Sequence, residues 1–113
     1  MLIIDAHEDI AYNALAWGRD IRASAYATRE QEAQHAEGFE LENIAMNGLP
    51  DLRRGGFGIV FGVIFTFPMR AIPGATEKFA QAYHTAEEAY LAGQQQLAYY
   101  RQLAQEPGTV SYT

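Results

Sequence analysis

Residues 2–9 read Leu-Ile-Ile-Asp-Ala-His-Glu-Asp, and the interpretation of the rest of the chain starts from this stretch. Three apolar residues lead directly into an imidazole and three carboxylates, which is typical of a buried β-strand that ends in polar side chains. Side chains alternate between the two faces of a strand. We therefore expect His7 and Asp9 on one face, with Asp5 one step behind them. Glu8 should point to the opposite side.

An imidazole and a carboxylate two residues apart at the end of a strand can form half of a metal site. Imidazole nitrogen and carboxylate oxygen are both good ligands for Zn²⁺ and similar divalent ions. Folds of the α/β class place their chemistry at the carboxyl ends of buried strands. The His-x-Asp pattern is short, however, and also occurs where no metal binds. By itself it makes His7 and Asp9 candidate ligands.

Composition narrows the class of protein. The 113 residues have the size of one domain, and 49% of them are hydrophobic, which is enough for a core. The formal charge of −6 argues against a nucleic-acid partner, which requires clustered basic residues. The sequence has no Cys, so disulfides and thiol chemistry are excluded. No apolar run approaches the roughly 20 residues of a membrane span, and no signal peptide is recognisable. We expect a soluble, cytoplasmic protein without a membrane partner.

The first half of the chain predicts little regular structure after the opening strand. Residues 10–17 mix apolar and small side chains, and Gly18 follows, so a loop or short turn is predicted there. Thr28, followed three residues later by glutamine, fits a capping box. A polar surface helix is therefore predicted over residues 29–37, with Gly38 as its stop.

A second strand is predicted in the middle of the chain. Pro50 follows an Asn-Gly turn and suits the first turn of a short helix. Residues 57–65 then form a nearly unbroken run of apolar, β-branched and aromatic residues, as in a strand buried on both faces. Gly58 and Gly62 would let a neighbouring group approach this strand closely. Pro68 should close the strand region, with a loop after it.

A long helix is predicted over residues 77–105, and Pro107-Gly108 should stop it. Apolar and small residues recur there at steps of three and four, which indicates one helical face. Its tyrosines are expected to pack rather than to form a binding site, and Gly93 to allow close packing against a strand. Residues 110–113 look like the start of another strand. The predicted face consists of Phe79, Tyr83, Ala86, Tyr90, Gly93, Leu97, Tyr100 and Ala104.

The order of these elements predicts an α/β fold. The predicted order is a strand, a long connection, a second strand, a long helix and the start of a third strand. This is the order of βα repeats, which form a parallel sheet. Parallel strands need both faces covered, which two strands and the start of a third cannot achieve alone. The sequence therefore predicts the N-terminal, incomplete part of a TIM-like (β/α)8 barrel, a fold of about 250 residues.

Two motifs add a family resemblance. Residues 4–9 resemble the opening Asp-x-His-x-Asp strand of the membrane (renal) dipeptidase family, in the amidohydrolase superfamily. Residues 48–58 read Gly-Leu-Pro-Asp-Leu-Arg-Arg-Gly-Gly-Phe-Gly, with Val-Phe-Gly-Val at 60–63. They are similar to that family's Leu-Pro-x-Leu-Arg-x-Gly-x-Val-Gly-x-x-Phe segment, which enters its second strand. The resemblance covers nearly the whole chain, and the two motifs in this order are fairly specific.

The resemblance implies a zinc-dependent dipeptidase with two zinc ions bridged by a glutamate, and it makes residues 1–113 the N-terminal fragment of one metallohydrolase barrel domain. The first-strand ligands of one zinc correspond to His7 and Asp9. The family's other ligands and its catalytic aspartate lie on strands beyond the third. We therefore expect no catalytic residue in this chain and at most one weakly held zinc. His35 and His84 fall in predicted helices and are expected to be solvated or packing residues.

The implied reaction is hydrolysis of a dipeptide amide bond by a metal-activated water, with Asp5 or a backbone group orienting His7. The isolated chain is expected to be inactive. Its expected partners are the remainder of the barrel or a second copy in a homo-oligomer, because exposed strand edges favour association. Two alternatives stay open. One is a non-catalytic interaction module that associates through its strand edges, and the other is an amidohydrolase acting on a different amide or ester.

Overall fold

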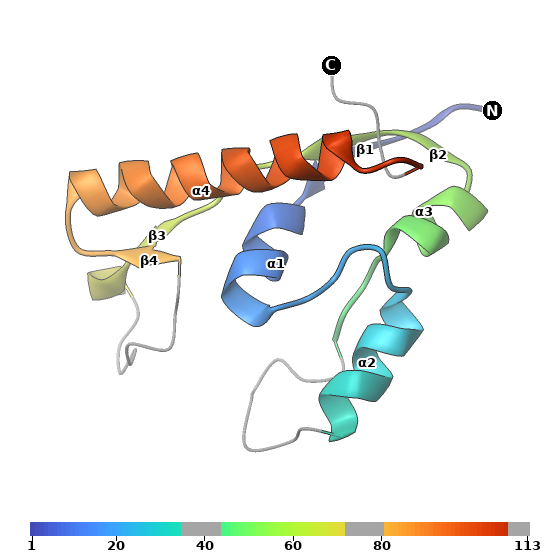
Figure 1. Ribbon diagram of the computed structural model, residues 1–113, viewed down its shortest axis with the longest axis horizontal. Coiled ribbons are helices and arrows are strands. Elements are labelled where there is room, and N and C mark those ends of the chain that lie inside the picture. Colours follow the sequence, from blue (N-terminus) through green and yellow to red (C-terminus); the bar gives the residue numbers. More distant parts are fainter. Residues whose placement is uncertain (35–43, 72–80, 109–113) are drawn as a thin grey trace. The chain divides into compact units, whose positions relative to one another are not determined.

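The computed structural model describes residues 1–34, 44–71 and 81–108 (Figure 1). This part of the chain is mixed α/β, with two small parallel sheets that pair β1 with β2 and β3 with β4. The mixed α/β class confirms the coarser prediction, and the (β/α)8 barrel stays a prediction. The strands are β1 (Ile3–Glu8), β2 (Phe57–Gly62), β3 (Phe67–Pro68) and β4 (Ala82–Tyr83). The helices are α1 (Ile10–Trp17), α2 (Ala25–Gln34), α3 (Leu49–Arg54), the 3-10 turn η1 (Met69–Ala71) and α4 (Ala86–Gln105).

The chain divides into two compact units. The first comprises residues 1–5 and 19–60, and the second comprises residues 6–18 and 61–113. β1 and β2 each contribute residues to both units. No helix in the described ranges is both long enough and apolar enough to cross a lipid bilayer.

Helix α2 in the first unit begins earlier than predicted. The hydroxyl of Ser24 accepts a hydrogen bond from the Ala27 amide at 3.1 Å, and Asp51 Oδ2 accepts one from the Ala25 amide at 2.7 Å. These acceptors satisfy first-turn amides that a helix leaves unpaired. The predicted capping box at Thr28 is therefore wrong, because Thr28 lies inside the helix and is buried. The predicted end of this helix lies outside the described residues.

Helix α3 confirms the prediction made from Pro50. Gly48 is its N-cap, and Pro50 occupies the first turn, where a missing amide hydrogen is tolerated. The Leu49 amide donates to the carbonyl of Ile21 at 2.7 Å. This bond anchors the start of α3 to the segment that precedes α2. The core of the first unit contains Ile21, Ala25, Ala45, Leu49 and Leu52.

The predicted loop at residues 10–17 is wrong, because these residues form α1 in the second unit. Ile10 and Ala11 are buried, and α1 packs against α4. Gly18 has a φ of 66°, so it is the left-handed residue that ends the helix. The segment that was predicted as a loop is instead a short helix that lies against a long one (Figure 1).

Helix α4 ends where the predicted long helix ends, but it begins later than predicted. Thr85 is its N-cap and forms a capping box with Glu88, so residues 81–85 are not helical as predicted. The helix ends at Gln105, before the predicted Pro-Gly stop. Residues 77–80, predicted as the first turn of this helix, and the predicted strand at 110–113 lie outside the described residues.

The buried side of α4 is rotated from the predicted face. Most predicted residues of this face that fall in the helix are half-buried, and Tyr90 is 65% exposed. The buried residues of α4 are Ala92, Gln96 and Leu103. The prediction was wrong because it placed only apolar and small residues on the buried face, and a glutamine occupies its centre.

Strand β2 is shorter than predicted, and its expected close contacts are confirmed. A Cβ on Gly58 would lie 2.3 Å from Leu2 Cδ1, and one on Gly62 would lie 2.6 Å from Tyr100 Cε1. Burial on both faces is not achieved within the described part of the chain, because Phe61 remains 57% exposed. Pro68 does not close the strand region, since it pairs with Tyr83 in the sheet of β3 and β4.

Candidate functional site

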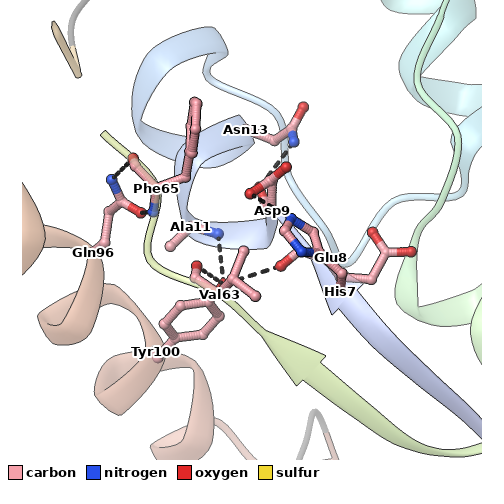
Figure 2. A network of polar contacts seen from close by, with 9 residues as sticks. All are labelled: His7, Glu8, Asp9, Ala11, Asn13, Val63, Phe65, Gln96 and Tyr100. Atoms are coloured by element: carbon pink, nitrogen blue, oxygen red, sulfur yellow. Dashed lines mark hydrogen bonds and ion pairs between the residues drawn. The ribbon is translucent and has the colours of Figure 1, made fainter. Parts of the chain in front are cut away.

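The two candidate metal ligands lie where β1 passes into α1, in the second unit. His7 is the penultimate residue of β1, and Asp9 is the N-cap of α1. His7 Nε2 lies 3.5 Å from Asp9 Oδ1, and the Glu8 carboxylate points away from this pair (Figure 2). The structure thus brings together the two side chains expected on one face. Their role as metal ligands stays a prediction.

The Asp9 carboxylate has one buried oxygen without a hydrogen bond. Its side chain is 36% exposed as a whole, yet Oδ1 is buried and has no hydrogen-bond partner. As an N-cap, Asp9 would ordinarily accept a bond from the first turn of α1, but its side chain makes none. A buried polar atom left unpaired is unfavourable unless something else satisfies it. A cation held between Asp9 and His7 would do so.

The separation of the two candidate atoms is compatible with a shared zinc ion. Two ligands bound at about 2.0–2.2 Å in tetrahedral geometry lie roughly 3.4 Å apart. His7 Nε2 and Asp9 Oδ1 are 3.5 Å apart, and the His7 side chain is 68% exposed, so an ion from solvent could reach it. The same separation also suits a simple ion pair, so metal titration must distinguish the two.

Two tyrosines lie close enough to be affected by the Asp9 charge. Burial, and then the negative charge of Asp9, raise the pKa of Tyr12 above its usual value. Burial is also the largest cause that raises the pKa of Tyr100, with a smaller contribution from Asp9. Both hydroxyls therefore stay protonated at neutral pH and can donate hydrogen bonds.

A hydrogen-bonded network supports the junction of β1 and α1 (Figure 2). The Tyr100 hydroxyl donates to the carbonyl of Val63 at 2.9 Å and accepts from the Ala11 amide at 3.3 Å. The Val63 amide in turn donates to the carbonyl of Glu8 at 3.0 Å. The sequence analysis assigned Tyr100 to packing, and nothing in its helical spacing indicates a polar role.

The sequence analysis assigned no role to Gln96. It is fully buried in α4, and its amide pairs with both backbone groups of Phe65. Its Nε2 also donates to Gln81 Oε1 at 2.9 Å. A side-chain amide that accepts from an N–H and donates to a C=O imitates the pairing of a neighbouring strand. Gln96 thus satisfies the backbone of the segment that follows β2 (Figure 2).

The remaining predicted site residues are less informative. Asp5 is half-buried in the part of β1 that belongs to the first unit, and its orienting role stays a prediction. His84 lies 3.4 Å from Glu88, with 69% of its side chain exposed, which confirms a solvated histidine. His35 lies outside the described residues. Among residues 1–34, 44–71 and 81–108, no group of three or more histidine and acidic side chains could hold a metal ion.

No family model, curated protein or solved structure matches this chain. The resemblance to the dipeptidase family accordingly rests on the two sequence motifs alone.

Proposed function

We propose that this chain is the N-terminal segment of a zinc-dependent dipeptidase, in which His7 and Asp9 hold one metal ion. The observation that carries the proposal is the buried, unbonded Oδ1 of Asp9, which lies 3.5 Å from His7 Nε2. Nitrogen and oxygen of this kind form a suitable donor pair for zinc. The two sequence motifs supply the choice of dipeptidase chemistry.

The residues of this chain would have distinct tasks in such a site. Asp9 presents its carboxylate at the N-terminus of α1, where the helix dipole favours negative charge. His7 presents its exposed imidazole beside this carboxylate. A zinc ion bound there would polarise an amide carbonyl and acidify a bound water. The donors of a second ion and the catalytic aspartate would come from other parts of the barrel, so the isolated chain should lack turnover.

Zinc titration tests the proposed ligands. In isothermal titration calorimetry, His7→Ala and Asp9→Asn should each weaken zinc binding at least about tenfold, because the first removes one of two donors and the second replaces a carboxylate by a neutral amide. His84→Ala is the matched control, since His84 also lies beside a carboxylate and its side chain is 69% exposed against 68% for His7, but it lies outside the proposed site. An isotherm unchanged by His7→Ala would remove His7 from the site. Equal losses in His7→Ala and His84→Ala would show unspecific binding.

Activity of the isolated chain gives a second test. A colorimetric assay of the purified 113-residue chain with zinc and a dipeptide should show little or no turnover. Robust turnover would contradict the assignment of the catalytic machinery to other strands. For a longer protein that contains this chain, a screen of dipeptides, other amides and esters would separate a dipeptidase from another amidohydrolase.

Exposed apolar side chains in the strands and directly before β1 favour the second candidate function, a non-catalytic interaction module. In the first unit, Leu2 and Ile4 are 62% and 54% exposed, and in the second unit Phe61 is 57% exposed. Exposed apolar strands favour pairing with another chain. This candidate predicts self-association, measured by light scattering, that Ile4→Lys abolishes, together with a flat zinc isotherm. A monomer that binds zinc through His7 would exclude it.

A further inference from the structure

The backbone of Asp9 is part of a ring that three hydrogen bonds close through Val63 and Tyr100. The ring runs from the Glu8 carbonyl to the Val63 amide, and from the Val63 carbonyl to the Tyr100 hydroxyl. It returns from the Tyr100 hydroxyl oxygen to the Ala11 amide. Glu8 and Ala11 flank the segment that carries Asp9, so the backbone of this segment completes the ring (Figure 2).

The Tyr100 hydroxyl is the only side-chain group in this ring. Its oxygen also lies 3.5 Å from the Glu8 carbonyl, so it approaches both ends of the segment. The Ala11 amide belongs to the first turn of α1, where an amide has no partner within the helix. Ala11 is fully buried, so water does not readily replace the hydroxyl as its acceptor.

A glycine makes room for this tyrosine. A Cβ on Gly62 would lie 2.6 Å from Tyr100 Cε1 and 2.9 Å from its hydroxyl oxygen. Real Cβ contacts are not that short, so any larger residue at position 62 would displace the aromatic side chain of Tyr100. Gly62 at the end of β2 therefore leaves room for Tyr100 in the C-terminal half of α4, whose hydroxyl reaches the β1–α1 junction.

We propose that Tyr100 is a positioning residue, whose hydroxyl holds the Glu8–Ala11 segment so that the Asp9 carboxylate stays beside His7 to bind metal. The inference rests on the proposed function, because it assigns a supporting residue to the same site. It adds a residue that is 91 positions away from Asp9 in the sequence and that neither family motif contains. Residues that orient metal ligands affect metal affinity by about 10- to 100-fold when they are replaced.

The test compares Tyr100→Phe with Tyr90→Phe in the full chain. Both remove one tyrosine hydroxyl from α4, but Tyr90 is 65% exposed and serves as the control. Tyr100→Phe should weaken zinc binding about tenfold in calorimetry. It should also speed hydrogen exchange of the Ala11 amide about tenfold, because that amide loses its acceptor. Tyr90→Phe should change neither. Gly62→Ala should reproduce both effects of Tyr100→Phe.

The outcomes separate this inference from the proposed function. If the wild-type chain binds zinc and Tyr100→Phe binds it equally well, the positioning role is overturned and the His7 and Asp9 ligands stand. If the wild-type chain binds no zinc, the proposed function fails. Ala11 exchange then decides whether the hydroxyl holds the segment, and unchanged exchange overturns the inference. If Tyr100→Phe does not fold, a slowly exchanging Tyr100 hydroxyl proton in the wild-type NMR spectrum supports the inference, and its absence overturns it.

Discussion

Replacement of Gln96 by methionine should destabilise the chain by a measurable amount. The Gln96 amide accepts from the Phe65 N–H at 2.9 Å, donates to the Phe65 carbonyl at 2.6 Å and donates to Gln81 at 2.9 Å. At about 1 kcal/mol of net stabilisation for each bond, their loss removes about 3 kcal/mol. Methionine has a similar length, and its apolar burial returns about 1 kcal/mol. The expected loss is therefore about 2 kcal/mol.

Urea denaturation followed by far-UV circular dichroism measures this loss. A decrease of about 2 kcal/mol should lower the midpoint by about 1 M urea. Gln95→Met is the matched control, because Gln95 neighbours Gln96 but is exposed, and it should change stability by less than about 0.5 kcal/mol. If the two variants unfold at the same midpoint, the Gln96 amide does not stabilise the chain, and the reasoning is refuted.

Three further predictions concern helix ends and backbone. Thr85→Ala should destabilise α4 by about 1 kcal/mol in urea unfolding, whereas Thr85→Ser should not, because serine keeps the capping hydroxyl. The pKa of Asp51 is lowered, mainly because the Ala25 amide donates to its carboxylate. The stabilisation from the ionised Asp51 carboxylate should therefore be complete above about pH 4 and disappear as the pH falls through the lowered folded-state pKa. The difference in unfolding free energy between wild type and Asp51→Asn should accordingly narrow from pH 7 to pH 3, and a constant difference would contradict this. Gly48→Ala should destabilise far more than Gly18→Ala, because a Cβ on Gly48 would lie 2.0 Å from a backbone carbonyl oxygen, whereas Gly18 has open space and only a positive φ; equal midpoint shifts would refute the comparison.

Local patterns predicted some elements well. The apolar run at residues 2–4, which leads into polar side chains, predicted β1, and a proline after an Asn-Gly turn predicted α3. Both patterns act through backbone preferences that hold in any surroundings, since Pro50 presets the first turn of a helix. The closeness of His7 and Asp9 was predictable for the same reason, because only Glu8 separates them at the end of the strand.

The misread elements were those whose signals are shared by competing structures. Gly18 indicates a loop and a helix C-cap equally well, and only the packing of α1 against α4 distinguishes the two. Thr28 and Ser24 can both cap a helix. The first-turn amides of α2 are satisfied by Ser24 and by Asp51, and Asp51 lies 26 residues away in the chain. No local pattern contains that partner.

By itself, the sequence determined the secondary structure of the opening strand, the short helix at Pro50, the C-terminal limit of α4 and the closeness of the two candidate ligands. These features depend on backbone dihedral preferences and on neighbours a few residues apart. Tertiary structure alone decided that Asp9 Oδ1 is buried without a hydrogen bond, and that Tyr100 and Gln96 satisfy backbone groups beyond their own helix. The physical reason is that a buried polar group must find a partner wherever the fold brings one, and the distance along the chain does not restrict that choice.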